Sequence, residues 1–208
     1  MGNDKKLGYV PGRVSETLEY AYSDWCLSVL AEDLGCKEAA AEYFERSRSY
    51  SKVFDEEQGW FRPRNADGTW KEWPEEGRLK ESYGCVESNL YQQGWFVPHD
   101  IPGMADLMGG RTKTLADLTN FFEKCPSDFL WNAYYNHANE PVHHVPFLFN
   151  RLGAPWLTQY WTRAICNGAY KNKVEGLVGN EDVGQMSAWY VLSAMGFHPV
   201  CPGETRYA

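Results

Sequence analysis

Two adjacent carboxylates stand at the entrance of an apolar helix near the end of the chain. Glu181 and Asp182 lie in a polar turn between Gly179 and Gly184, and the apolar pattern of 185–195 predicts the helix. The N–H donors of a helix N-terminus stabilise ionised carboxylates, and an ionised carboxylate can act as a general base. An Asp before a helix is also a common N-cap, and the spacing alone favours this structural role.

A second group of polar residues offers oxygen ligands. Asn139 and Glu140 stand side by side on a predicted loop that Pro141 stiffens. Carboxylate and amide oxygens are the ligands that Ca²⁺ prefers, although the sequence has no EF-hand spacing. The next pair, His143 and His144, could indicate zinc, but zinc needs three or four convergent ligands, and the sequence shows no such set. We therefore expect the two histidines to cap a helix or to form hydrogen bonds.

Five long motifs lie along the chain in a fixed order. They are GYVPGRVSETLEYAYSDW, FRPRNADGTW, ESNLYQQGWFVPHDIPGMADLMGG, YNHANEPVHHVPFLFNRLGAPWLTQYWTR and GNEDVGQMSAWYVLSAMGFHPVCPG. Together they span nearly all of the chain and resemble the glycoside hydrolase family 92 α-mannosidases. Long motifs in order are far more specific than one short pattern. The resemblance implies a calcium-dependent, inverting exo-α-mannosidase with a β-sandwich domain followed by an (α/α)6 barrel, and the chain resembles the later part of that barrel.

The resemblance assigns roles to the carboxylates. Inverting hydrolysis needs an acid that protonates the leaving oxygen and a base that activates water, roughly 6.5–9.5 Å apart. Glu87 matches the family's acid, and its apolar and aromatic neighbours would favour the protonated form. Asp182 matches the base, with Asn180 and Glu181 as supporting or alternative groups. Without the resemblance, Glu87 is better explained as a carboxylate at a helix N-terminus. Family members often carry Gly-Asn-Ala-Trp after this Glu, whereas this chain has Ser-Asn-Leu-Tyr. The resemblance therefore assigns the acid but not the details of the sugar subsite.

The remaining site predictions follow from the same resemblance. Asn139 and Glu140 are expected to bind Ca²⁺, or the substrate through the 2- and 3-hydroxyls of the sugar. The residues expected to contact a mannose-containing glycan are Asn180, Glu181, Trp95, His99, Asp100 and His137. The stretch His-Ala-Asn-Glu that begins at His137 resembles the members specific for α-1,2 linkages, as in N-glycan-type glycans.

Two polar pairs in loops have a structural alternative. His99 and Asp100 are adjacent, and Arg62 and Arg64 flank a proline. For each pair, a structural salt bridge is as good an explanation as a functional role.

The composition is that of a folded chain. Apolar residues make up 43% of 208 and aromatic residues 15%, which suits one domain with a sizeable core. Most aromatic residues are expected in that core, although such rings also stack on sugars. The net charge of −8 argues against a nucleic-acid surface. No apolar run reaches the roughly 18 residues of a membrane span, and the first residues lack a signal-peptide pattern, whereas the resemblance implies a periplasmic or secreted protein.

The six cysteines show no Cys-x-x-Cys spacing. A zinc or thioredoxin-like site is therefore not expected. Most of them stand in apolar helical patterns, which is typical of buried free thiols. The sequence leaves disulfides open.

Apolar periodicity predicts an all-α chain. The predicted helices are 15–34, 37–54, 88–96, 101–109, 112–124, 142–151, 155–171 and 185–195. A long loop at 55–84 contains a short hairpin at Asp67-Gly68, and a second loop is 125–140. The resemblance adds that these hairpins form part of an (α/α)6 toroid, whose loops would bring Glu87, Glu140 and Asp182 together.

The number of predicted helices is too small for a twelve-helix barrel. We therefore expect 1–208 to be part of one (α/α)6 catalytic domain, without the N-terminal β-sandwich and the first hairpins. Such a part alone is not expected to hydrolyse mannosides.

Two other functions remain open from the sequence. A carbohydrate-binding or scaffold module would use the aromatic residues and acids without hydrolysis, and it would need neither Glu87 nor Asp182. A metal-independent (α/α) glycosidase or lyase would keep its activity in EDTA.

Overall fold

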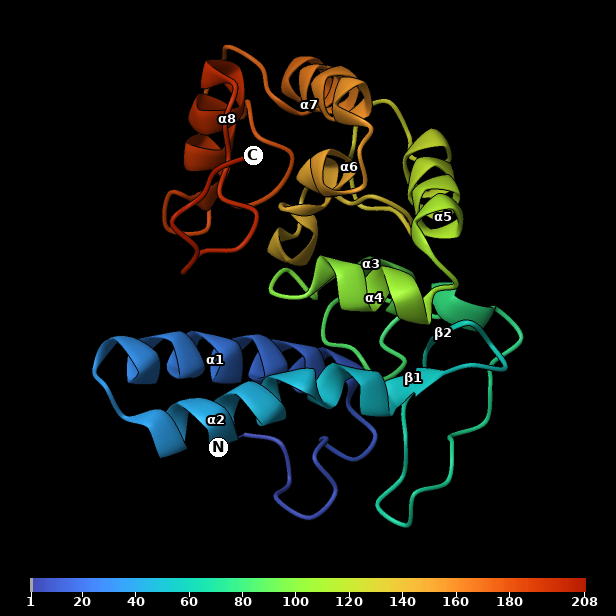
Figure 1. Cartoon of the computed structure of the whole chain (residues 1–208). Helices are drawn as coiled ribbons and strands as arrows, with labels where there is room; N and C mark the ends of the chain where they lie inside the picture. Colours follow the sequence, from blue (N-terminus) through green and yellow to red (C-terminus); the bar gives the residue numbers. More distant parts are fainter. Residues whose placement is uncertain (1) are drawn as a thin grey trace. The chain divides into compact units, whose positions relative to one another are not determined.

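The computed structural model describes residues 2–208, which form two compact units. The first unit ends at Gly110, and the second is Arg111–Ala208. Within the described residues, eight α-helices (α1 to α8) and several short 3-10 helices account for nearly all regular structure, and the sheet has two short strands (Figure 1). The predicted all-α class is confirmed. Of the described helices, none is both long and apolar enough to cross a membrane.

The first unit begins with a helical hairpin. Its helices, α1 (Val14–Asp33) and α2 (Lys37–Ser47), lie side by side (Figure 1). The chain turns between them at Gly35, whose φ of 73° lies in the left-handed region that glycine adopts at no steric cost. The helix α1 begins one residue before the predicted start at 15, and the Ser15 hydroxyl in its first turn donates to the carboxylate of Glu16.

The helix α2 is shorter than its sequence pattern predicts. It gives way to a 3-10 helix, Arg48–Val53. The hydroxyls of Ser47 and Ser51 donate to carbonyls three residues earlier, and such bonds compete with regular helix formation. The chain then enters strand β1 (Phe54–Asp55), which pairs antiparallel with β2 (Trp60–Phe61). The prediction of a helix as far as β1 is therefore wrong.

Two arginines order the long loop that follows β2. Arg62 donates to the Asp55 carboxylate at 2.8 Å, so the salt-bridge interpretation is confirmed for this residue. Arg64 instead donates to backbone carbonyls, and its guanidinium lies 4.9 Å from the ring centroid of Trp70. The backbones of Arg64 and Trp70 pair across a turn at Asp67-Gly68, which confirms the predicted hairpin.

The first unit ends with two short helices, α3 (Leu90–Gln93) and α4 (Ile101–Leu107). Asn89 caps α3, because its side chain accepts from the N–H of Gln92 and the Gln92 side chain accepts from the N–H of Asn89. Asp100 caps α4 by accepting from the Gly103 N–H at 2.9 Å.

Close packing explains why α3 is much shorter than the predicted helix at 88–96. Gly94 ends the helix, and a Cβ at this position would lie 2.7 Å from the Trp60 ring. The rings of Trp60 and Trp95 form the core against which Tyr91 of α3 packs. Their burial fixes the chain here more strongly than helix propensity does.

The second unit contains four α-helices (Figure 1). They are α5 (Arg111–Glu123), α6 (Leu148–Arg151), α7 (Pro155–Ala169) and α8 (Gln185–Met195). The ring of Phe122 on α5 is central to the core, because it stacks on Tyr135 at 4.6 Å and on Trp161 at 5.1 Å between centroids. The predicted bounds of α8 are confirmed, and its C-cap is Gly196 with a φ of 90°.

The predicted helix at 142–151 is broken into three pieces. Two 3-10 helices, Glu140–Val142 and Val145–Phe147, precede the four-residue α6. Pro141 and Pro146 stand in the first turns of the 3-10 helices. Proline lacks the N–H that a continuous α-helix needs, so the prediction of one helix is wrong here.

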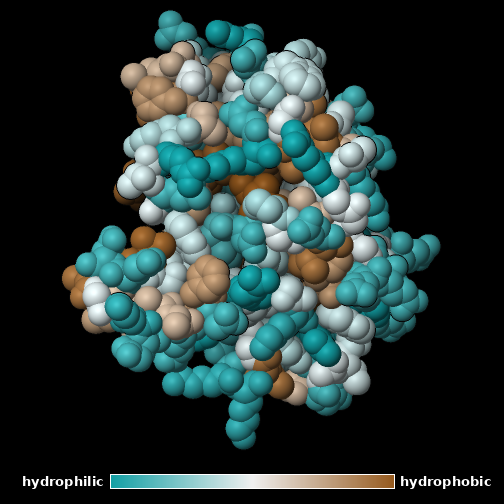
Figure 2. Space-filling model, in the orientation of Figure 1, coloured by the Kyte–Doolittle hydropathy of each residue, from teal (hydrophilic) through white to brown (hydrophobic). Residues whose placement is uncertain are grey.

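Each unit exposes apolar side chains on its helices. In the first unit, Leu30 and Leu34 at the end of α1 are 54% and 69% exposed, and Figure 2 shows apolar surface over this end of the hairpin. In the second unit, Trp156 of α7 and Met195 of α8 are exposed to a similar extent. All six cysteines are free thiols, two of them buried and only Cys36 exposed.

Candidate active site

Glu87 stands at the tip of a tight turn before α3. Its backbone has a φ of 50°, in the left-handed region. This conformation costs a residue with a Cβ about 1–3 kcal/mol, and such residues cluster at functional sites. The side chain is exposed, whereas the neighbouring Cys85 and Ser88 are buried. The expectation that apolar neighbours favour the protonated form of Glu87 stays a prediction.

Backbone hydrogen bonds from two directions hold the Glu87 turn. The N–H of Val14, at the start of α1, donates to the carbonyl of Gly84 at 2.6 Å. The N–H of Ser82 donates to the carbonyl of Ser88 at 2.9 Å, across the turn. The buried Asn89 then caps α3. Because Asn89 is the N-cap, Glu87 lies outside α3, two residues before the cap.

The two adjacent acids in the turn before α8 differ in their hydrogen bonds. The Glu181 carboxylate accepts from the N–H of Ser187 at 3.0 Å and from its hydroxyl at 2.9 Å, so Glu181 stabilises the first turn of α8. The N-cap position belongs to Gly184, which has a φ of 92°. Asp182 is therefore not the N-cap. No described residue donates a hydrogen bond to its carboxylate, and the side chain is half-buried.

Three consecutive residues of this turn have left-handed backbones. The φ angles are 49° at Asp182, 58° at Val183 and 92° at Gly184. Glycine adopts this conformation freely, but a β-branched residue such as valine rarely does. The turn therefore holds Asp182 in a conformation that the chain would not adopt without surrounding constraints.

The Asn139–Glu140 loop lies against the turn that carries Asp182. Gly179 has a φ of 140°, and a Cβ on it would lie 3.0 Å from both the Cβ and the carbonyl oxygen of Ala138. Asn139 is buried and Glu140 is exposed at the start of a 3-10 helix. The second unit thus places Ala138, the residue before Asn139, against Gly179 at the start of the turn that carries Asp182.

A metal ion needs several convergent ligands from the described residues. No group of three His, Cys, Asp or Glu among them could hold one. The amide and carboxylate oxygens of the predicted ligands Asn139 and Glu140 suit Ca²⁺ in kind but not in number, because Ca²⁺ takes six to eight oxygens. The remaining ligands would come from water, substrate or backbone carbonyls.

Buried histidines connect the loop to α8. His137 is fully buried, with one ring nitrogen 2.8 Å from the Tyr135 hydroxyl and the other 2.7 Å from the Tyr170 hydroxyl. His143 is also buried, and its Nδ1 lies 3.2 Å from the Gln185 amide. Burial lowers the pKa of both rings, and the Asp182 charge partly offsets this effect for the pKa of His143. The expected hydrogen-bonding role is confirmed for His143.

The structure makes direct sugar contact difficult for two predicted substrate-binding residues. The His137 ring has no exposed nitrogen, and Trp95 is fully buried with its ring centroid 5.1 Å from that of Trp60. Both are core residues within their units. Asn180 and Glu181 are exposed, and substrate binding by them stays a prediction.

His99 and Asp100 are not an ion pair. The His99 Nε2 bonds the carbonyl of Ser47 at 3.0 Å, and its ring packs against Tyr22, as well as against Trp25. Asp100 accepts from the Tyr50 hydroxyl at 2.5 Å, in addition to capping α4. The salt-bridge interpretation is therefore wrong for this pair, and substrate binding by these residues stays a prediction.

The site residues are divided between the units. Glu87 belongs to the first unit and Asp182 to the second. Tyr170, Gln185 and Gly179 are contacts of the second-unit site that the sequence analysis missed. Only Gly179 carries a sequence signal, because a glycine beside a polar turn indicates a special backbone conformation or a close approach.

The whole chain belongs to glycoside hydrolase family 92. Residues 1–208 match the family model described as the glycosyl hydrolase family 92 catalytic domain. The family assignment from the sequence motifs is therefore confirmed.

Solved structures of family members are similar to this chain. The family GH92 α-mannosidase BT3965 from Bacteroides thetaiotaomicron is 35% identical and superposes with a TM-score of 0.88 over 97% of this chain and 27% of its own. The inverting mannosidase BT2199 from Bacteroides thetaiotaomicron VPI-5482 is 34% identical, with a TM-score of 0.87 over 98% of this chain and 30% of its own. These mannosidases have an (α/α)6 catalytic domain, and the predicted fold class is confirmed.

A fungal relative is also similar. An uncharacterized secreted glycosidase from Arthroderma benhamiae is 28% identical over 98% of this chain and 29% of its own length. The chain thus spans less than a third of these relatives.

Proposed function

We propose that the chain supplies Glu87 as general acid and Asp182 as general base to an inverting, calcium-dependent exo-α-mannosidase. The observation that carries the proposal is the backbone of the two acids. Five described residues other than glycine have a positive φ, and two of the five are Glu87 and Asp182. Backbone strain at both residues that the family motifs assign to catalysis supports their preorganisation.

The proposed reaction is a single displacement at the anomeric carbon. Glu87 donates its proton to the glycosidic oxygen as the C–O bond breaks, and Asp182 accepts a proton from the water that attacks the opposite face. Glu181 is already engaged with Ser187, which supports Asp182 as the base in preference to its neighbour.

Asn139 and Glu140 would hold the Ca²⁺ ion, because the family motifs point to these two residues. Their side chains offer the oxygen ligands that Ca²⁺ prefers. When bound, the ion would hold the 2- and 3-hydroxyls of mannose. The His-Ala-Asn-Glu stretch supports α-1,2-linked mannose as the substrate. The mannoimidazole complex of the α-mannosidase BT3965 supports mannose in the cleaved position.

The functional unit in this proposal includes further polypeptide. Residues 1–208 would form part of one (α/α)6 catalytic domain, with further hairpins and a β-sandwich domain supplied in addition. The exposed apolar side chains on α1, α7 and α8 support this proposal, because large apolar surfaces of folded domains are usually covered. The secreted fungal relative supports a secreted or periplasmic location.

The test is hydrolysis of an α-1,2-linked mannobiose in the presence of Ca²⁺, followed by NMR of the product before mutarotation. The proposal expects β-mannose as the first product of the complete catalytic domain and no turnover by residues 1–208 alone. Initial release of α-mannose would refute inversion. Sugar binding without hydrolysis by the complete domain would favour a binding module, and robust turnover by the 208-residue chain as a monomer would refute the need for further polypeptide.

A further inference from the structure

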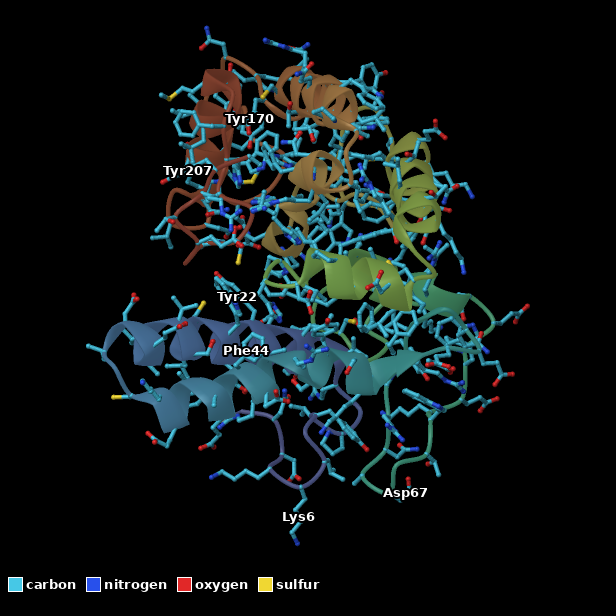
Figure 3. All side chains as sticks on the ribbon, viewed as in Figure 1. Lys6, Tyr22, Phe44, Asp67, Tyr170 and Tyr207 are labelled. Carbon is cyan, nitrogen blue, oxygen red and sulfur yellow. The ribbon has the colours of Figure 1, made fainter. Side chains whose placement is uncertain are left out.

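The hydroxyl of Tyr170 joins two parts of the second unit. Tyr170 directly follows α7 and lies between α7 and α8 in Figure 3. Its oxygen is 2.7 Å from Nε2 of His137 and 3.0 Å from the carbonyl oxygen of Met186, in the first turn of α8. One hydroxyl therefore connects the loop before Asn139 with the helix that follows Asp182.

The chemistry of the partners fixes the direction of each hydrogen bond. The Met186 carbonyl can only accept, so the Tyr170 hydroxyl donates to it. The Tyr170 oxygen then accepts from His137, which places the proton of the neutral ring on Nε2. The Nδ1 of His137 is left as an acceptor, so the Tyr135 hydroxyl donates to it at 2.8 Å. We call this series, from Tyr135 to Met186, the tyrosine–histidine chain.

A second set of bonds runs parallel to this chain. The Nε2 of His143 faces the carbonyl of His137 at 3.0 Å and must donate to it, so its Nδ1 accepts from the Gln185 amide at 3.2 Å. The Trp189 indole on α8 donates to the carbonyl of His143 at 2.8 Å. The His137 and Trp189 rings meet at 4.4 Å between centroids. Both histidines thus tie the loop to α8.

We propose that Tyr170 is a positioning residue that holds the Asp182 turn in register with the Asn139–Glu140 loop. The proposal rests on the proposed function, because the register matters for catalysis only if these residues bind and hydrolyse a sugar. The N–H groups of Gln185 and Met186 bond the carbonyls of Asp182 and Glu181. A movement of the first turn of α8 therefore moves the base, and a displacement of about 1 Å can reduce a rate by about 100-fold.

The first experiment measures the connection itself in the 208-residue chain. Nitrogen-15 NMR of the histidine rings is expected to show His137 and His143 as neutral Nε2–H tautomers. Tyr170→Phe is expected to speed amide hydrogen exchange at Gln185 and Met186 by about tenfold, because it leaves a buried N–H and a carbonyl without their partner. A protonated Nδ1 on neutral His137, or unchanged exchange at both amides, would overturn the proposal.

Two matched tyrosine variants distinguish positioning from general stability. Tyr160→Phe changes an exposed tyrosine on α7, which is 62% exposed, and is expected to leave exchange unchanged. Tyr135→Phe removes a fully buried hydroxyl from the far end of the tyrosine–histidine chain and keeps the bond between Tyr170 and Met186. It is expected to lower Tm as Tyr170→Phe does, but to leave exchange at Gln185 nearly unchanged. Equal acceleration by Tyr135→Phe and Tyr170→Phe would overturn a specific role for Tyr170.

The second experiment measures hydrolysis by the complete catalytic domain proposed above. Tyr170→Phe is expected to reduce kcat by about 10- to 100-fold, with KM changed less than about twofold, because it displaces the base more than the sugar. A loss confined to KM, or an unchanged kcat despite faster exchange, would overturn the catalytic consequence. If the wild-type domain does not hydrolyse mannosides, the proposed function fails, while the tautomers and the exchange rates still decide whether Tyr170 holds the turn.

Discussion

Replacing Val183 with glycine should stabilise the protein and impair its chemistry. Val183 follows the proposed base, has a φ of 58° and is fully exposed, with a relative accessibility of 109%. The valine side chain therefore contributes no burial, while its Cβ opposes the left-handed backbone. Glycine removes this strain, and the backbone hydrogen bonds of the turn can still form.

The size of the effect follows from two opposing contributions. Left-handed backbone costs a residue with a Cβ about 1–2 kcal/mol. Glycine costs about 0.5–1 kcal/mol, because it has more freedom in the unfolded chain. Val183→Gly should therefore raise the free energy of unfolding by about 0.5–1 kcal/mol, or raise Tm by about 1–4 °C for a chain of this size.

A second exposed valine provides the control. Val174 is 97% exposed and lies in a loop of the same unit, without a positive φ. Val174→Gly relieves no backbone strain and only increases the conformational entropy of the unfolded chain. It should therefore lower Tm by about 1–4 °C. Thermal unfolding of both variants, followed by circular dichroism, measures the difference. If Val183→Gly lowers Tm as much as Val174→Gly does, the turn is not strained and the argument is wrong.

Strain at the turn should also show in the rate. A relaxed turn holds Asp182 less firmly, so Val183→Gly in the complete catalytic domain should reduce kcat by about tenfold or more with little change in KM. An unchanged kcat together with a raised Tm would show that the strain has no role in catalysis.

Three further outcomes are expected. Glu87→Gln should reduce hydrolysis of mannosides with poor leaving groups by about 10²–10⁴-fold and that of activated aryl mannosides less; equal losses would argue against Glu87 as the acid. Chelation should remove activity, and Ca²⁺ but not Zn²⁺ should restore it, because Asn139 and Glu140 offer oxygen ligands; full activity after exhaustive EDTA treatment would contradict the metal assignment. Gly179→Ala should lower the free energy of unfolding by about 1–3 kcal/mol, since its Cβ would meet Ala138 at 3.0 Å on a strained backbone; an unchanged Tm would show that the loop moves aside.

The elements that the sequence predicts best have both apolar periodicity and clear end signals. The helix α8 has such a pattern between Gly184 and Gly196, and its bounds are those predicted. The helix α7 begins at Pro155, which is favourable in a first helical turn. At α7 and α8 the local helix preference and the tertiary packing favour the same structure, so the apolar periodicity is sufficient to predict these helices.

Tertiary packing decides the places where the predictions are wrong. The pattern at 88–96 is helical, but the Trp60 ring against Gly94 leaves room for only a four-residue α3. Likewise, no spacing rule could show that Glu181, not Asp182, stabilises the start of α8, because that depends on where Ser187 places its hydroxyl. Tyr170 lies 33 residues from His137, and its role depends on a contact that the sequence does not encode locally.

The fixed direction of the tyrosine–histidine chain has a consequence for how related sequences can diverge. Each member donates a hydrogen bond to the next, and the backbone carbonyl of Met186 accepts the last one. A single change at buried His137 or half-buried Tyr170 leaves an unmatched polar atom on both sides of the changed residue. Paired changes at the two positions should therefore be less harmful than the sum of the single changes. Among descendants of such a sequence, the two positions should covary, and intermediate forms with one of the pair should be rare.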